Sequence, residues 1–188
     1  MAVRVSLNDV VLSASEACCS LYVERGTADL TVAEICAATG LSQRSFYRYF
    51  PVKADSVQPV LDWTTATFNS HVATASEAPT RTILREGFRR MLGGQHAERT
   101  RMLTRIMVAD PELWSVFLRA VHFGEVSLIP ALADRLRLPA DSARARVAAA
   151  AVAAATRLAL EDLVGSDIDP EEPFMAFIDA FGSGLFDT

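Results

Sequence analysis

Cysteine is scarce in this sequence of 188 residues, and lysine is almost absent. The three cysteines are Cys18, Cys19 and Cys36, and no Cys-x-x-Cys pair occurs. A small odd number of cysteines without metal-ligand spacing argues against a disulfide scaffold and against a zinc domain. We therefore expect buried, reduced thiols in a cytoplasmic protein. The single lysine, Lys53, means that arginine supplies nearly all of the basic side chains.

Long hydrophobic runs are also missing. The most apolar stretch, residues 147–155, consists largely of alanine, and Arg157 and Glu161 follow it closely. A run of this length is too short to span a bilayer. The N-terminal 26 residues interleave charged and apolar side chains, which is not the pattern of a signal peptide. No membrane partner is expected.

Catalytic and cofactor motifs are absent as well. The sequence has no His-Glu-x-x-His, no Gly-x-Ser-x-Gly, no P-loop and no Gly-x-Gly-x-x-Gly. The three histidines, His71, His96 and His122, are far apart and have no metal-ligand spacing. An enzyme is therefore the least favoured class, and we predict neither a cofactor nor a metal.

What the chain does contain is a helical period along almost its whole length. With 51% hydrophobic residues and no alternating strand pattern, it predicts an all-α fold of about nine helices. The first helix is expected to begin at an N-cap Ser6 and to stop at Gly26, and the second lies between the capping box Thr31–Glu34 and Gly40. The later helices are predicted at 43–50, 53–75, 81–92, 97–108, 112–136 (with Gly124 and Pro130 as candidate breaks), 141–164 and 170–181, the last with Asp169 as N-cap.

The second and third predicted helices form a helix-turn-helix. Gly40 permits a positive φ in the turn, and Ser42 is a good N-cap for the helix that follows. Ile35, Phe46 and Phe50 have the spacing of residues that are buried together. This leaves the opposite face of the third helix outward, and it carries Gln43, Arg44, Tyr47 and Arg48.

Charge supports this interpretation. The chain is acidic overall, with a net charge of −5 and a pI of about 5.2, which argues against a whole-protein polyanion binder. Residues 35–54, however, contain no acid and carry a net charge of +3. Arginine and glutamine pair with base edges in the major groove, whereas lysine, serine and tyrosine suit phosphates. One helix and its flank are therefore predicted to bind DNA.

The stretch TVAEICAATGLSQRSFYRYFPVKAD, residues 31–55, resembles the DNA-binding signature of the TetR family of bacterial regulators. The resemblance extends over about residues 10–60. Two departures from the family pattern are Arg44, where many members have glycine or proline, and Ala33, where some have a base-reading polar residue. Arg4 is a weak candidate for a basic arm. The resemblance implies phosphate contacts from Thr31, Ser42, Tyr47, Tyr49 and Lys53, and base contacts from Gln43, Arg44, Ser45 and Arg48.

The family resemblance also implies a division of the chain. Residues 1–53 would form the DNA-binding domain, and residues 54–188 a helical domain for effector binding and dimerisation. A homodimer would place two recognition helices roughly 34–36 Å apart, on a palindromic operator. The dimer is expected to form through apolar residues of the last two predicted helices, and the alternative is that these residues are core within one chain. The expected dimer seam contains Ala151, Ala155, Leu158, Phe174, Phe177, Ile178 and Phe181.

A small, largely apolar effector of unknown identity is expected among the middle helices, where it would release the DNA. Arg81, Arg85 and Arg89 form a stripe that is either a solvated face or an anchor for an anion. Two other classes stay open: a redox sensor that uses the cysteines, and a helical protein-interaction module without operator binding. We expect a bacterial cytoplasmic protein, associated with the nucleoid when bound to DNA. The candidate pocket residues are Trp63, Phe88, Met91, Met102, Ile106, Trp114, Phe117 and His122, with Phe68, Met107, Leu118 and Phe123 nearby in sequence.

Overall fold

The computed structural model describes residues 7–181, and within them it is all helical, as predicted. Ser6 and Arg4 lie outside the described residues. The α-helices of the described part are Leu7–Arg25 (α1), Val32–Thr39 (α2), Gln43–Tyr49 (α3), Gln58–Thr74 (α4), Thr80–Met91 (α5), Ala97–Ala109 (α6), Pro111–Arg135 (α7), Ala143–Glu161 (α8) and Glu171–Ala180 (α9), with 3-10 turns at Lys53–Val57 (η1) and Gly94–His96 (η2).

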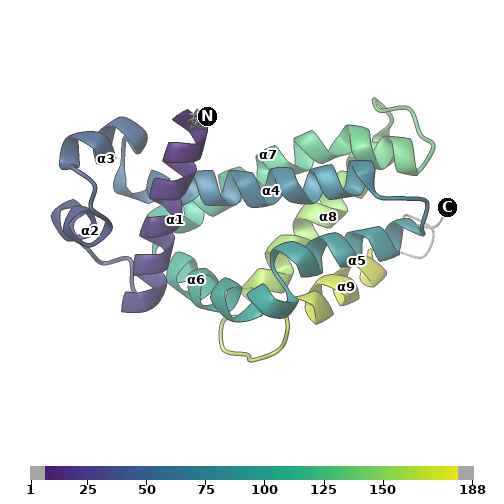
Figure 1. Cartoon of the computed structure of the whole chain (residues 1–188). Coiled ribbons are helices and arrows are strands. Elements are labelled where there is room, and N and C mark those ends of the chain that lie inside the picture. Colours follow the sequence, from purple (N-terminus) through teal and green to yellow (C-terminus); the bar gives the residue numbers. More distant parts are fainter. Residues whose placement is uncertain (1–6, 182–188) are drawn as a thin grey trace.

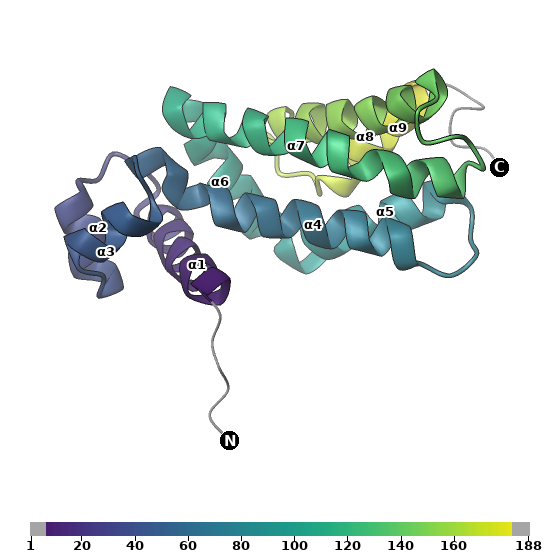
Figure 2. The same ribbon diagram turned by 90° about the horizontal axis from the view of Figure 1, so that it is seen from above.

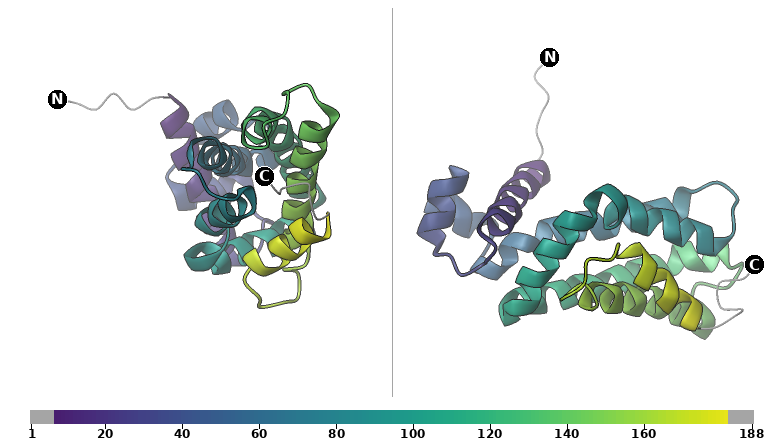
Figure 3. Two further views of the ribbon diagram at one scale, coloured as in Figure 1. Left: turned by 90° about the vertical axis from the view of Figure 1, so that its right-hand side faces the viewer. Right: turned by 90° about the horizontal axis from the view of Figure 1, so that it is seen from below.

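The helices form a small unit at one end of an elongated body (Figure 1). The small unit is α1, α2 and α3. In the body, α4 and α7 run lengthwise side by side, and α8 packs on α7 (Figure 2). Seen from below, α9 lies along α8 (Figure 3). The described chain therefore ends far from the helix-turn-helix.

Local sequence signals determine the small unit. The Thr31 hydroxyl accepts a hydrogen bond from the Glu34 amide while the Glu34 carboxylate accepts one from the Thr31 amide, so the predicted capping box is present. Gly40 ends α2 with φ 72°, a left-handed conformation that glycine adopts without steric cost. The Ser42 hydroxyl accepts from the Ser45 amide and starts α3.

Two long helices differ from the prediction. The segment expected as one helix from residue 53 begins with the 3-10 turn η1, and α4 starts only at Gln58, with Pro59 in its first turn. Proline fits there because an N–H in the first turn has no partner within the helix. The helix α7 is not broken at Gly124 or Pro130. Burial of Leu128 and Leu132 beside Pro130 holds it, although proline removes one backbone hydrogen bond.

Arginines of α7 fasten it to both ends of α4. Arg119 bonds to the Gln58 side chain and, at 2.9 Å, to a carboxylate oxygen of Asp55. At the other end, Arg135 donates to the carbonyl groups of Val72 and Ala75, which end α4. A cation suits the carbonyl end of a helix. These contacts make α4 and α7 one pair that spans the length of the body.

The buried side chains form two clusters. The first joins α1, α2 and α3 to the nearer ends of α4, α6, α7 and α8. The second lies among α5, α7, α8, α9 and the last turn of α4. The small unit is thus packed directly onto the body. Its core continues through Phe46, Phe50 and Ile35 into Ile106 and Phe117.

Four residues of the expected dimer seam lie inside the second cluster. Ala151, Ala155, Phe174 and Ile178 are each at most 4% exposed, and the Phe174 ring stacks on Phe88 at 4.1 Å between centroids. They are core within one chain because α8 and α9 pack against each other and share this cluster, and they have almost no surface left for a second copy. Three members of the expected seam reach the surface to some degree: Leu158, Phe177 and Phe181.

The arginine stripe of α5 faces acids of α9. Arg81 makes two hydrogen bonds, of 2.7 and 2.6 Å, to the Asp179 carboxylate. These bonds lower the pKa of Asp179. Arg85 and Arg89 lie 3.7 and 3.6 Å from the Glu171 carboxylate. The stripe therefore pairs with α9, which weakens the hypothesis that it anchors an anionic effector.

Among the described residues, α7 is long and apolar enough to cross a membrane, judged by length and composition alone. Core helices of soluble proteins meet the same criterion. Here α7 packs against α4, α6 and α8 within the body.

Candidate nucleic-acid interface and effector cavity

The outer face of α3 is open along its whole length. Gln43, Arg44, Tyr47 and Arg48 are exposed, as the sequence predicted. Phe46 is fully buried on the opposite face and holds the helix by edge contacts to Tyr47 and Phe50. A rigid helix that presents arginine and glutamine outward has the form that enters a major groove.

Arg48 is oriented by its neighbour. Its guanidinium donates a 2.8 Å hydrogen bond to the Tyr49 hydroxyl and lies 4.8 Å from the centroid of that ring. Stacking of this kind restrains a long side chain and leaves further N–H groups free to donate. Tyr49 itself is half-buried, and Ser45 is half-buried at the other end of α3.

Besides Tyr49, three predicted phosphate contacts make hydrogen bonds inside the chain. The Lys53 ammonium donates at 2.9 Å to the Ala28 carbonyl and so ties η1 to the loop before α2. An ammonium has three donors, so Lys53 keeps donors for a phosphate. The hydroxyls of Thr31 and Ser42 serve their helix N-termini, and bonds from Thr31 lower the pKa of the exposed Glu34 carboxyl.

A buried polar network seats α1 on the start of α4. The Ser15 hydroxyl donates at 2.6 Å to the Ser56 carbonyl and accepts from the Val60 amide at 3.3 Å. The Tyr22 hydroxyl and the Ser56 hydroxyl share a hydrogen bond of 2.9 Å. Ser15, Tyr22 and Ser56 are all fully buried. The network sets the position of the DNA-binding helices relative to the body, and no local pattern in the sequence indicated it.

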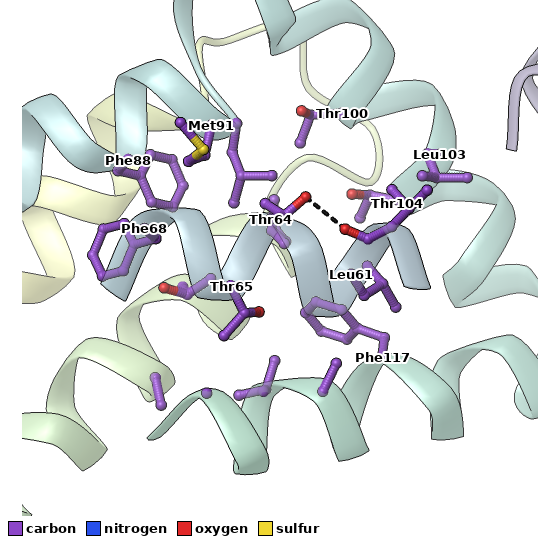
Figure 4. A pocket seen from close by; sticks show the side chains of 18 of the residues that line it. Leu61, Thr64, Thr65, Phe68, Phe88, Met91, Thr100, Leu103, Thr104 and Phe117 are labelled. Atoms are coloured by element: carbon purple, nitrogen blue, oxygen red, sulfur yellow. Dashed lines mark hydrogen bonds between the residues drawn. The ribbon is translucent and has the colours of Figure 1, made fainter. Parts of the chain in front are cut away.

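The body contains a cavity of about 150 Å³ (Figure 4). It lies among α4, α5, α6, α7 and α8. Phe88, Met91 and Phe117 of the predicted pocket line it, together with Phe68 and Met107. In Figure 4 the rings of Phe68 and Phe88 gather at one side, and Thr100 and Thr104 lie at the other.

The other five predicted pocket residues do not line the cavity. Trp63 and His122 are exposed, because they lie on the outer faces of α4 and α7. Ile106 is buried in the core shared with α1, and Trp114 stacks on Phe117 from outside the cavity at 4.7 Å between centroids. Met102 is half-buried and also lies outside the lining.

The sequence analysis missed the polar part of the lining. Thr100 and Thr104 share one face of α6 with Met107, at a spacing of four and then three residues. That spacing was visible in the sequence but indicated only a helix face. The remaining polar lining is Thr64, Thr65, Asn69, His96, Arg99, Glu125 and Thr156.

The cysteines offer little to a redox mechanism. Cys18 and Cys19 are fully buried and Cys36 is 7% exposed. Burial raises the pKa of Cys18 and of Cys19 to about 12, and it also raises the pKa of Cys36. A neutral, inaccessible thiol is a poor nucleophile, so the redox alternative is disfavoured. Within residues 7–181 no three His, Cys, Asp or Glu side chains group as metal ligands.

The exposed basic face of α3, on a three-helix unit packed against a larger helical body, defines a helix-turn-helix DNA-binding regulator. Residues 16–55 match the family model described as bacterial regulatory proteins of the tetR family. The matched segment, residues 16–55, is therefore identified as a DNA-binding segment of the TetR type, and regulators of that family are non-enzymatic.

Solved structures share the fold over nearly the whole chain. The TetR-family repressor AlkX from Dietzia sp. strain DQ12-45-1b is 17% identical, with a TM-score of 0.64 over 94% of this chain and 98% of that one. A tetR-family regulator from Streptomyces coelicolor is 16% identical, with a TM-score of 0.60 over 94% and 80%. SmeT, the repressor of the Stenotrophomonas maltophilia efflux pump SmeDEF, is 20% identical, with a TM-score of 0.57 over 96% and 93%. No curated protein matches the sequence.

Proposed function

We propose that the chain is a homodimeric repressor that binds a palindromic operator and is released by a small, largely apolar effector. The observation that carries the DNA-binding part is the exposed face of α3, with Gln43, Arg44 and Arg48, within the segment that matches the family model. Repressor action is supported by relatives of the same fold, AlkX and SmeT, which are described as repressors. The protein would work in the bacterial cytoplasm and be associated with the nucleoid when bound to DNA.

The contacts are divided by chemistry. Gln43, Arg44, Ser45 and Arg48 face the bases in this proposal. A second group of residues would contact phosphates, and such contacts position the helix without reading the base sequence. That group is Thr31, Ser42, Tyr47, Tyr49 and Lys53.

We divide the chain functionally at residue 53, with DNA binding in 1–53 and effector binding and dimerisation in 54–188. The division falls where η1 begins, although the first hydrophobic cluster continues across it. That continuity supports mechanical coupling, because movement of α4 or α6 cannot leave α1 undisturbed. The effector must bind the two states with different affinity to shift the equilibrium.

Operator binding is tested by selecting duplexes from a randomised pool with the purified protein. We expect a palindrome to be enriched. Arg44→Ala should relax one base position at a cost of about 1–3 kcal/mol. Lys53→Ala should weaken binding to all sequences and make the salt dependence shallower by about one unit of slope.

The matched control is Arg90→Ala, which removes an exposed arginine from α5, a helix outside the DNA-binding unit. It should leave operator affinity and salt slope unchanged. If no duplex is enriched, and binding stays at the non-specific level of roughly 10⁻⁴–10⁻⁶ M at physiological salt, the operator-binding proposal is wrong. The helical protein-interaction module would then be the better interpretation.

A further inference from the structure

Polar side chains line several walls of the cavity, and the two basic ones lie on α6 or just before it. Thr100 and Thr104 of α6 line the cavity, with Arg99 beside them and His96 just before the helix. The other walls are formed mainly by apolar side chains, of which Phe68, Phe88 and Phe117 are the largest. Their polar members are Thr64, Thr65, Asn69, Glu125 and Thr156. A ligand that fits this lining has an apolar body and one polar end, and the polar end lies against α6.

One hydroxyl on that side has no partner within the described chain. Thr104 is 1% exposed, and its hydroxyl oxygen makes no hydrogen bond. Two other threonines of the lining behave differently: Thr64 and Thr156 donate to the carbonyl groups four residues earlier, at 2.8 and 2.9 Å. An unsatisfied buried hydroxyl costs free energy, so its position in the cavity wall points to a polar group brought by a ligand.

Arg99 connects the cavity to the DNA-binding unit. It lines the cavity, and its guanidinium is hydrogen-bonded to the Glu16 carboxylate of α1. Both side chains are partly exposed, 43% for Arg99 and 38% for Glu16, so the pair is held only weakly and a competing anion can replace Glu16. The lining also contains the carboxylate of Glu125 on α7, which repels an anion at that side of the cavity.

We propose that the effector is an apolar molecule with one carboxylate, which pairs with Arg99 in place of Glu16 and accepts a hydrogen bond from Thr104. This inference rests on the proposed function, because it names the ligand class of the same cavity. Loss of the Arg99–Glu16 pair frees α1 from α6 at one of their contacts. The carboxylate thereby changes the position of α1, and with it that of α2 and α3, relative to the body. No covalent step is involved.

The test is direct ligand binding, without DNA. Trp114 stacks on Phe117, which lines the cavity, so its fluorescence should report occupation, and Trp63→Phe removes the second tryptophan. The probes are straight-chain carboxylates of graded length that end in a phenyl group, each paired with the alcohol of equal length. We expect the best acid to bind about tenfold more tightly than its alcohol, since a charge-assisted hydrogen bond replaces a neutral one.

Three variants and one control variant separate the parts of the proposal. Arg99→Gln should abolish the preference for the acid, whereas Arg105→Gln, on the same helix but outside the lining, should keep it. Thr104→Val should weaken binding of the acid and leave the fold intact, because the two side chains have nearly the same shape. Glu16→Gln should tighten binding of the acid a few-fold, since the internal competitor is gone, and should reduce the effect of the acid on DNA affinity.

Equal affinity for acid and alcohol, a preference that survives Arg99→Gln, or no binding by any acid of the series would overturn the inference. None of these outcomes affects the selection of operator duplexes, because that experiment uses the protein without a ligand. Failure of the carboxylate proposal is therefore distinct from failure of the proposed function.

Discussion

At the scale of single residues, the hydrogen bond between Tyr22 and Ser56 joins α1 to η1. It is fully buried, and each hydroxyl is left without this partner if the other is removed. We expect Tyr22→Phe to lower the free energy of unfolding by about 1–2 kcal/mol, because the Ser56 hydroxyl loses a partner. Urea denaturation measures this change.

The matched cycle uses Ser56→Ala and the double variant. Each single variant strands one hydroxyl, whereas the double variant strands neither, so the double loss should be smaller than the sum of the single losses. Additive losses would show that the two hydroxyls do not act as a pair. The Tyr22→Phe protein should also bind operator less tightly if this network positions the DNA-binding helices.

At the scale of helices, the close approach of α4 and α7 depends on Gly124. A Cβ atom built at Gly124 would lie 2.5 Å from Cγ2 of Thr65, which no real contact permits. Gly124→Ala should therefore force the two helices apart and destabilise the fold by about 1–3 kcal/mol, the usual cost of overpacking. The effect should appear in thermal and urea unfolding.

Thr65→Ser provides the compensating change, because it removes the clashing methyl group and keeps the hydroxyl. The double variant Gly124→Ala/Thr65→Ser should recover most of the lost stability. If it recovers none, crowding at this point is not the reason for the glycine. Because Thr65 also lines the cavity, ligand affinity should follow the same order as stability.

The sequence predicted those helices whose ends are set by local chemistry. The Thr31–Glu34 capping box, Gly40 and Ser42 act within a few residues, so α2 and α3 were predicted almost to the residue. It was harder to predict which residues line the cavity. Helical spacing cannot tell which apolar face turns inward, and Trp63 and His122 lie outside because α4 and α7 pack through their other faces. The Arg99–Glu16 pair joins residues that are 83 positions apart, which no local pattern reports.

At the scale of the whole molecule, the proposed palindromic operator requires two copies of the chain, and the exposed residues limit where the copies can meet. Ala151 and Phe174 are occupied by the core of one chain, so the α8 seam must use the residues that face outward. An outward row on α8 consists of Val147, Ala150, Ala154 and Leu158, which recur at helical spacing. Its small side chains permit a second α8 to approach closely.

We therefore expect Val147→Glu to convert the proposed dimer to a monomer, as measured by light scattering after size exclusion. Val147 is 55% exposed in the single chain, so a charge is tolerated there unless a partner covers it. Operator affinity should fall with the dimer, because one recognition helix reads too few base pairs. Phe123→Glu is the matched control on α7, at 60% exposure, and should remain dimeric. The reverse result, a monomer from Phe123→Glu and a dimer from Val147→Glu, would move the seam from α8 to α7.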